Sequence, residues 1–479
     1  NTYELKYSQS FGYDSRHRLS QTTLKTTAGG NDIVQVDYTY SDDDLLTDKI
    51  INVSGNTYKT YYTYNRGGFL TNSTQYRIVD GVQEDTFIYS NSLSYDIRGN
   101  IVTRRDNGID ENRVTTYTYD AYNRLIKEIV DDTDKTVTTT YAYDESNNRI
   151  SAVESDSSKT GTVNKSYVYN AANQLTHETV VDSSETKVYT YTYDDGGNLL
   201  TKNQTVGDTT STLQTHEYDA FNRLSLLTTE KGNTAYKYDA TGYRITKTTG
   251  AEKTHHYWSG DSIIFDEQID GSAVAEQGYV FGSGLEATTI NGSAAYSYIQ
   301  DVHGDVKYLQ ADDSVNSYTY DAYGNTLSGE QTISNPYRYN GQYYDEESGN
   351  YYLRARYYDT SIGRFTQEDT VHGDATMPGT LNRYNYAGGN PVMITDPSGH
   401  AWETFLDILS FGDSLYTFIK EPSWGNAGML IWDTAALVAP VVPGSYVAKA
   451  VKTVDRADDF IDAVKTADRI DDTTDALRA

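Results

Sequence analysis

Tyrosine and threonine alternate in short stretches that recur through the first 240 residues of the chain. One stretch, TTYTYD, runs from Thr115 to Asp120. A period of two predicts a β-strand, in which Tyr117 and Tyr119 share one face and Thr118 lies on the other. Turn-forming Asp, Asn and Gly follow, and a second run such as Arg124–Val130 completes a hairpin. The pattern therefore predicts a series of β-hairpins.

The hairpins form an internal repeat. Their second tyrosines are Tyr40, Tyr64, Tyr95, Tyr119, Tyr143, Tyr169, Tyr193, Tyr218 and Tyr238. Most intervals are 24 to 26 residues, with one of 31 and one of 20. A period in this range indicates stacked supersecondary units. We expect a mainly β fold with a ribbon of tyrosines on one sheet face, either stacking between repeats or facing a wide, wet surface.

The pattern changes after residue 400. Apolar residues recur at helical spacing over residues 401–419 and again over 447–470. The apolar stretch 427–444 is interrupted by Asp433, Pro440 and Pro443, which makes it too broken for a stable membrane span. We expect an α-helical C-terminal segment, with 427–444 as a buried helix or, alternatively, as a segment that enters membranes during delivery.

Composition marks the same boundary. Of 46 tyrosines, only Tyr416 and Tyr446 follow His400, and the first proline is Pro336. We divide the chain into a repeat array over residues 1–290, a modified end of the array over 291–400 and a helical segment over 401–479.

The formal net charge is −29, from 68 acidic and 39 basic residues. Nucleic acids and anionic membranes require a basic face, so neither is an expected partner. The absence of cysteine excludes disulfides and thiolate zinc sites, and suits an exported bacterial surface protein. The start, NTYELKYSQS, shows no secretory signal and resembles repeat sequence, so we expect a fragment of a longer protein.

No cofactor or metal site is predicted. His255 and His256 are adjacent, so in a strand they face opposite ways. The acidic cluster at residues 41–46 lacks the glycine and closing glutamate of a calcium loop. The sequence also contains no H-E-x-x-H, P-loop or G-x-S-x-G motif.

The repeat Y-x-Y-D followed by N-R-L resembles the YD repeat of Rhs and teneurin-like proteins. The resemblance becomes more specific from Ile299 onward. Four segments in order resemble the Rhs-associated core, namely IQDVHGDVKYL (299–309), YTYDAYGNTLSGE (318–330), NPYRYNGQYYDEESGNYYLRARYYDTSIGRFTQED (335–369) and LNRYNYAGGNPVMITDPSGH (381–400).

The resemblance implies that the repeats spiral into a hollow shell, a β-cocoon, and that the core at 291–400 plugs one end. It further implies that a C-terminal toxin is the encapsulated guest, that residues 401–479 are a pre-toxin connector, and that the effector itself is absent from this chain. Wall-associated members from Gram-positive bacteria imply a secreted or cell-wall location. Teneurin-like relatives imply the alternative of an adhesin that binds cell-wall or target-cell glycans.

In many members of this family the core cuts itself free as an aspartic protease, which needs two carboxylates that share one proton. The matching positions are Asp369 in GRFTQED and Asp396 in TDPSGH, with Arg364 as the expected counter-ion and Asp359 as a nearby alternative. The structural alternative is that Asp396 shapes a turn and Asp369 pairs with an arginine.

The chain departs from the self-cleaving members at two positions. Thr370 follows the first aspartate where those relatives carry proline, and His400 stands where they carry the leucine that precedes the cut. The sequence therefore predicts an encapsulating, toxin-delivering shell, with self-cleavage near residue 400 and glycan adhesion as alternatives.

Overall fold

The computed structural model describes residues 7–26, 32–109, 111–292, 294–311, 314–373 and 378–400. The predicted helical segment at 401–479 lies outside these residues. The described part is almost entirely β-structure, as the alternating pattern predicts.

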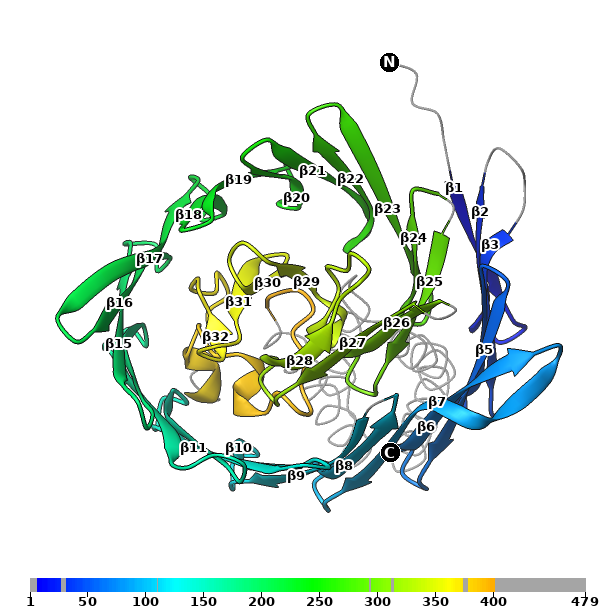
Figure 1. The fold of residues 1–479 in the computed structure, drawn as a ribbon, viewed down its shortest axis with the longest axis horizontal. Coiled ribbons are helices and arrows are strands. Elements are labelled where there is room, and N and C mark those ends of the chain that lie inside the picture. The colour runs from blue at the N-terminus through cyan, green and yellow to red at the C-terminus, as the bar shows by residue number, and fades with distance from the viewer. Residues whose placement is uncertain are drawn as a thin grey trace, which may run out of the picture. The chain divides into compact units, whose positions relative to one another are not determined.

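Two sheets and three short 3₁₀ turns make up the fold (Figure 1). The strands of the large sheet are β1 (Tyr7–Tyr13), β2 (Leu19–Thr26), β3 (Asp32–Tyr40), β4 (Leu46–Val53), β5 (Asn56–Tyr64), β6 (Leu70–Val79), β7 (Val82–Tyr95), β8 (Ile101–Gly108), β9 (Glu111–Tyr119), β10 (Leu125–Asp131), β11 (Thr136–Tyr143), β12 (Arg149–Asp156), β13 (Thr162–Tyr169), β14 (Leu175–Val181), β15 (Thr186–Tyr193), β16 (Leu199–Val206), β17 (Thr209–Tyr218), β18 (Leu224–Thr229), β19 (Gly232–Tyr238), β20 (Arg244–Thr249), β21 (Glu252–Ser259), β22 (Ser262–Asp270), β23 (Ala273–Phe281), β24 (Leu285–Ile290), β25 (Ala294–Gln300), β26 (Val306–Ala311), β27 (Ser314–Tyr320) and β28 (Thr326–Glu330). The other elements are η1 (Tyr339–Gly341), β29 (Tyr343–Asp345), β30 (Asn350–Leu353), β31 (Arg356–Asp359), β32 (Arg364–Phe365), η2 (Pro378–Leu381) and η3 (Ala387–Gly389).

The large sheet is a single antiparallel meander in which each strand pairs with the next along the chain. The nine repeat tyrosines found in the sequence are the last residues of the odd-numbered strands β3 to β19. The 31-residue interval is accommodated by β6 and β7, whose pairing is lengthened and twice irregular in register. The sheet continues past residue 290 to Glu330. The division placed at residue 290 therefore marks a change in the sequence pattern and does not separate two sheets.

An Asx-type turn follows eight of the nine repeat tyrosines, and Ser41 takes the same place after Tyr40. In the β9–β10 turn, the Asp120 carboxylate accepts the backbone N–H groups of Tyr122 and Arg124, both at 2.9 Å. Asn123 takes a positive φ of 61°, which asparagine tolerates better than most residues. The Arg124 guanidinium bonds Asp120 and then reaches the Asp144 carbonyl of the next turn at 3.1 Å. The D-x-x-N-R sequence thus builds this turn and ties it to its neighbour, and Asp219–Arg223 repeats the arrangement.

Eight of the nine repeat tyrosines also bind the preceding strand. Each hydroxyl donates to the carbonyl of the residue that opens the neighbouring strand, at 2.6 to 2.9 Å. The pairs are Tyr40–Leu19, Tyr64–Leu46, Tyr95–Leu70, Tyr119–Ile101, Tyr143–Leu125, Tyr169–Arg149, Tyr218–Leu199 and Tyr238–Leu224. The tyrosine ribbon therefore joins neighbouring strands through hydrogen bonds to the backbone.

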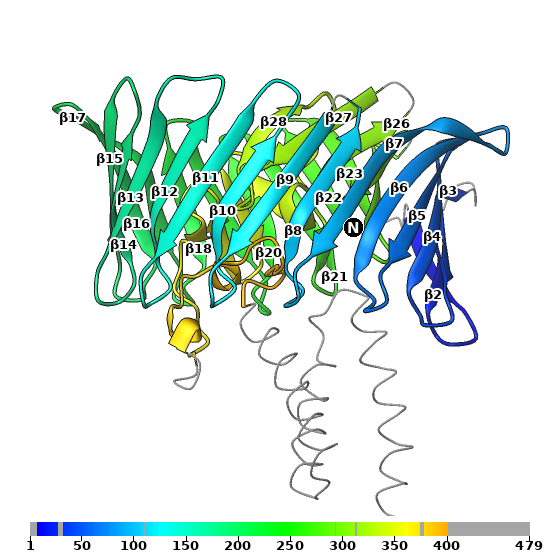
Figure 2. The same ribbon diagram turned by 90° about the horizontal axis from the view of Figure 1, so that it is seen from below.

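The register shifts by one residue beside these tyrosines. In the β9–β10 pair, Tyr119 faces Leu125 and Thr118 faces Lys127, so Ile126 is left as a bulge. The same shift recurs at Tyr143, Tyr169, Tyr193, Tyr218 and Tyr238. A bulge bends its strand and increases the local twist. Bulges repeated at the same edge give the sheet its continuous curl, with turns along both edges (Figures 1 and 2).

The curl brings the early strands against the late ones. Lys49 of β4 pairs with the buried Glu286 of β24 at 2.7 Å, and Lys307 of β26 pairs with Glu111 of β9 at 2.9 Å. Tyr38 of β3 also donates to Glu286 at 2.9 Å. Strands far apart in sequence are therefore joined by buried charges as well as by apolar packing.

The small sheet β29–β32 lies inside the curve of the large one (Figure 1). Arg244 of β20 forms a fully buried ion pair with Asp345, and Leu199 donates its backbone N–H to the Thr366 carbonyl at 3.0 Å. Tyrosines of the ribbon pack here on core rings, as Tyr141 does on Tyr323 at 5.2 Å between centroids. Within the described residues, this part of the ribbon is covered by the core.

We predict that Tyr119→Phe lowers the free energy of unfolding by about 1 kcal/mol, because the Ile101 carbonyl loses its donor. The measurement is urea unfolding followed by circular dichroism. Tyr122→Phe in the same hairpin is the matched control, since that ring is 81% exposed, and it should leave stability unchanged. Equal effects of the two substitutions would show that the tyrosine–carbonyl bond does not stabilise the sheet.

Candidate functional site

The structure brings Asp369 and Asp396 to one arginine. Asp369 lies just beyond β32, and Asp396 lies in the D-P-S-G turn. Arg356 of β31 places one nitrogen, Nη2, 2.7 Å from Asp369 Oδ2 and 3.4 Å from Asp396 Oδ2. All three side chains are at least nine-tenths buried. The two aspartates singled out by sequence therefore belong to one ion cluster.

Arg356 also holds the backbone around the aspartates. Its guanidinium donates to the Gly399 carbonyl and, at 2.9 Å, to the Arg383 carbonyl. It lies 3.6 Å from the centroid of the Phe365 ring. Gly399 has a φ of +79°, and a Cβ there would lie 2.5 Å from the Leu353 carbonyl oxygen. The segment that leads to residue 400 is thus fixed by one buried guanidinium and one glycine.

Arg364, the expected counter-ion, lies elsewhere. Its guanidinium donates to the Asn148 side chain at 3.4 Å and to the Asn173 carbonyl, both in turns of the large sheet. Asp359, the alternative carboxylate, pairs with Lys202 of β16 at 3.2 Å. Both residues fasten the core to the large sheet and are not part of the aspartate cluster.

His400 completes the cluster from the position where leucine was expected. Its Nδ1 lies 2.7 Å from Asp369 Oδ1. Burial alone would raise the pKa of Asp369, but the His400 hydrogen bond and the Arg356 charge outweigh it and lower that pKa. Burial lowers the pKa of Arg356, although an arginine remains charged in proteins.

This arrangement differs from a proton-sharing dyad. A dyad works because two carboxylates without a nearby cation cannot both ionise. Here Arg356 compensates the charge of both, and Asp369 is held ionised. The cluster acts as a clamp on the end of the core at neutral pH, and it gains a proton donor only when acid protonates one aspartate.

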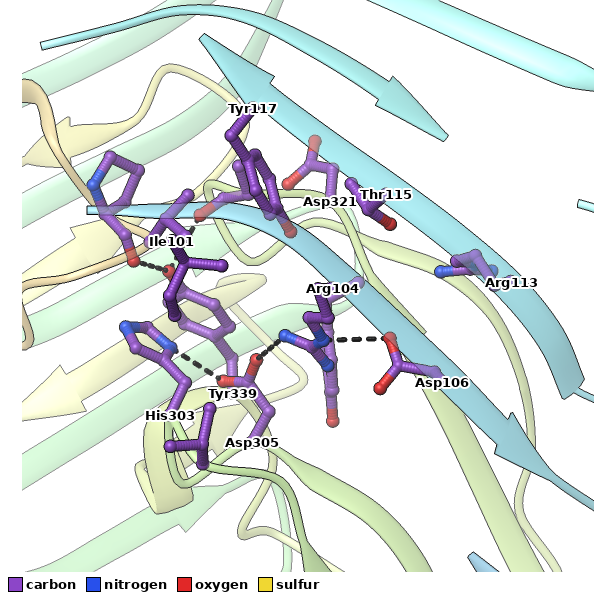
Figure 3. Close-up of a pocket in the computed structure, with 15 residues that line it drawn as sticks. Ile101, Arg104, Asp106, Arg113, Thr115, Tyr117, His303, Asp305, Asp321 and Tyr339 are labelled. Carbon is purple, nitrogen blue, oxygen red and sulfur yellow. Dashed lines mark hydrogen bonds and ion pairs between the residues drawn. The ribbon is translucent and has the colours of Figure 1, made fainter. Parts of the chain in front are cut away.

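A second polar cluster lies at the seam between β8–β9 and the core, around a cavity of about 30 Å³ (Figure 3). Arg104 contacts Asp106 at 2.8 Å, Asp301 and, at 3.8 Å, Asp305. Burial raises the pKa of Asp301 to about 7 despite the Arg104 charge, whereas the charges of Arg104 and Lys307 outweigh burial and lower that of Asp106 to about 2. Such a cavity holds a water molecule at most.

Apart from the turn motif that contains Asp301, nothing in the sequence pointed to this second cluster. Within the residues that the structure describes, no group of three His, Asp or Glu side chains is arranged to hold a metal ion. In that same part of the chain, no helix is long and apolar enough to cross a bilayer.

Fold and site together define a class, a curled meander of tyrosine-rich β-hairpins closed around a charged core. No family model matches the sequence. The chain is 33% identical over 237 residues to the tRNA nuclease WapA of Bacillus subtilis (strain 168), a match that covers 47% of this chain and 10% of WapA. It is 28% identical over 225 residues to the double-stranded DNA deaminase toxin A of Burkholderia cenocepacia (strain H111), covering 39% of this chain and 15% of that protein.

The chain thus spans about a tenth of the length of WapA. Among solved structures, the TcdB2-TccC3-TEV crystal structure is similar at 14% identity and a TM-score of 0.32, covering 82% of this chain and 27% of that one. The sequence similarities support the resemblance to YD-repeat toxins of the Rhs type.

We predict that Arg356→Met destabilises the protein by about 3–5 kcal/mol, because two buried carboxylates lose their cation. Adding Asp369→Asn and Asp396→Asn should recover most of that loss. Arg383→Met is the control, since its ion pair with Glu368 is partly exposed and should be worth about 1 kcal/mol or less. Urea denaturation of the four proteins measures this, and no recovery in the triple variant would contradict the clamp.

Proposed function

We propose that this chain forms part of a shell that sheathes and delivers a toxin domain, in a bacterial protein that is secreted or bound to the cell wall. The guest is the polypeptide that follows the core in the same protein. The proposal is supported by the sequence similarity to WapA and to the deaminase toxin, and by the curl of the sheet around the core.

The observation that carries this proposal is how firmly the core is fastened to the inner face of the sheet. Arg244 and Lys247 of β20 both pair with Asp345, and Lys202 of β16 pairs with Asp359. The core also adds backbone pairing, because Glu368 donates its N–H to the Gly197 carbonyl at 3.2 Å. A polypeptide that continues from residue 400 therefore starts from a segment anchored to the shell wall.

We predict that trypsin cuts residues 401–479 at least about tenfold more slowly in the folded protein than in the isolated peptide of the same residues, because sheathing requires local opening before cleavage. Mass spectrometry of timed digests measures the rates. The double variant Arg244→Met/Asp345→Asn removes a core anchor without leaving a buried charge and should speed the cutting. Equal rates for the wild type and the isolated peptide would rule out sheathing of this segment.

A second candidate function is self-cleavage beside residue 400. The observation in its favour is that His400 contacts Asp369 directly while Arg356 contacts Asp369, Asp396 and the Gly399 carbonyl. Two carboxylates thus gather at the segment where the related cores are cut.

We predict a single full-length mass at pH 7, because Arg356 and His400 keep the pKa of Asp369 below its ordinary value and this carboxyl therefore has no proton to donate. Below about pH 4 the wild type should divide near residue 400, whereas Asp369→Asn and Asp396→Asn should stay intact. Intact-mass spectrometry after timed incubation tests this. A wild type that stays whole at every pH makes the cluster a clamp alone.

A further inference from the structure

A buried glutamate, Glu128, lies where β10 meets the turn between β27 and β28. Glu128 of β10 is 3% exposed, and its Oε2 accepts the backbone N–H of Ala322, in the core turn after β27, at 3.3 Å. The Tyr141 hydroxyl lies 3.5 Å from the same oxygen. Among the described residues, no ion pair joins Glu128 to a lysine or arginine. A buried carboxylate without such a partner favours its protonated form.

The residue beside Ala322 is another carboxylate, Asp321. Its oxygens accept the N–H groups of Tyr323 and Asn325, both at 2.9 Å, and the Asn325 amide at 2.8 Å. Burial also raises the pKa of Asp321, but three donors to its oxygens favour the charged form. Of the two neighbours, Asp321 therefore keeps the negative charge and Glu128 keeps the proton.

Charged groups on the elements that surround Glu128 act on its pKa. Burial raises the pKa of Glu128, the Asp321 charge raises it further, and the Ala322 N–H, Arg113 of β9 and Arg104 of β8 act in the opposite direction. The resulting pKa is about 8. Arg149 of β12 and Lys165 of β13 act on Asp321, and the rings that face the site are Tyr117 and Tyr141.

We propose that Glu128 is a proton-operated contact between β10 and the β27–β28 hairpin, the part of the core region 291–400 that continues the large sheet. When protonated it accepts the Ala322 amide beside Asp321, and when ionised it repels Asp321 and loosens the core at this turn. The inference rests on the proposed shell function, because it gives the core a condition for release, namely alkaline surroundings.

The direction in which opening changes with pH follows from proton linkage. Once the contact opens, Glu128 returns to its ordinary pKa of about 4.5, so the open form binds fewer protons than the closed form between that value and 8. The equilibrium constant for opening therefore rises about tenfold per pH unit across this range and levels off above it.

The experiment is hydrogen exchange of the full chain at pH 6 to 9, followed by mass spectrometry on the peptide that contains residues 318–327. Dividing each variant's rate by that of the wild type cancels the intrinsic pH dependence of exchange. In Glu128→Gln the side chain stays neutral and still accepts from Ala322. Opening should be independent of pH in this variant, and about tenfold or more below the wild type at pH 8.

Glu178→Gln is the matched control. Glu178 stands three residues after Leu175, as Glu128 does after Leu125, and its Oε2 accepts the Tyr191 hydroxyl at 2.7 Å. The Lys202 charge interacts with Glu178, and within the described residues this glutamate does not contact the β27–β28 turn, so the variant should keep the wild-type slope. Asp321→Asn is the second variant, for use if Glu128→Gln fails to fold. It removes the like charge but not the burial, so opening should level off at a lower pH than in the wild type.

The inference would be overturned if opening depended on pH in the same way in the wild type and in the folded Glu128 or Asp321 variant. Trypsin cleavage of residues 401–479 in the same samples keeps the two proposals apart. If exchange depends on pH but residues 401–479 are unprotected from trypsin at every pH, the shell function is contradicted. If these residues are protected but exchange does not depend on pH, only the role of Glu128 is contradicted.

Discussion

The hydrogen bond from a repeat tyrosine to the carbonyl that opens the neighbouring strand is the constraint on which the rest of this structure depends. The register slips by one residue where Ile101 faces Tyr95, so the Ile101 carbonyl, which accepts the Tyr119 hydroxyl, needs a partner other than the regular ladder. A leucine side chain would also pack between repeats, but it has no hydroxyl to donate to the carbonyl. Tyrosine satisfies the carbonyl, packs its ring between repeats, and thereby stabilises a bulge in hairpin after hairpin. The sheet curls because each of these bulges bends it in the same sense.

Curvature then decides which residues far apart in the sequence meet. Because the sheet bends steadily in one sense, β4 reaches β24 and β9 reaches β26, and each junction carries a buried lysine–glutamate pair. Buried ion pairs add little net stability, since desolvation offsets most of the attraction. A mismatched charge at such a junction is costly, however, so the pairs favour one way of closing over slipped alternatives.

The sequence predicted the hairpins, the strand-ending tyrosines and the convergence of Asp369 with Asp396, because each is local or is carried by a motif. It did not predict Arg356 as their partner. Arg356 and Arg364 lie on neighbouring strands of a four-stranded sheet, and which one faces the aspartates depends on tertiary packing. Glu128 was missed for a related reason. Strict alternation from Leu125 places Lys127 and Ile129 inside, but the bulge at Ile126 changes the parity and buries Glu128 and Val130 instead.

These interactions divide the molecule into a durable part and a separable part. The sheet is held by contacts between neighbouring hairpins, such as Tyr119 with Ile101 and Arg124 with Asp144, which do not require the core. The core is held to the sheet largely by side-chain charges, such as Arg244 with Asp345, and by the uncharged contact at Glu128. A change in protonation acts on the second set and leaves the tyrosine ladder intact, because no charge takes part in a hydroxyl–carbonyl bond. The proposed shell is thus able to loosen its core without unfolding its wall, which is what the proposed delivery of an enclosed domain requires.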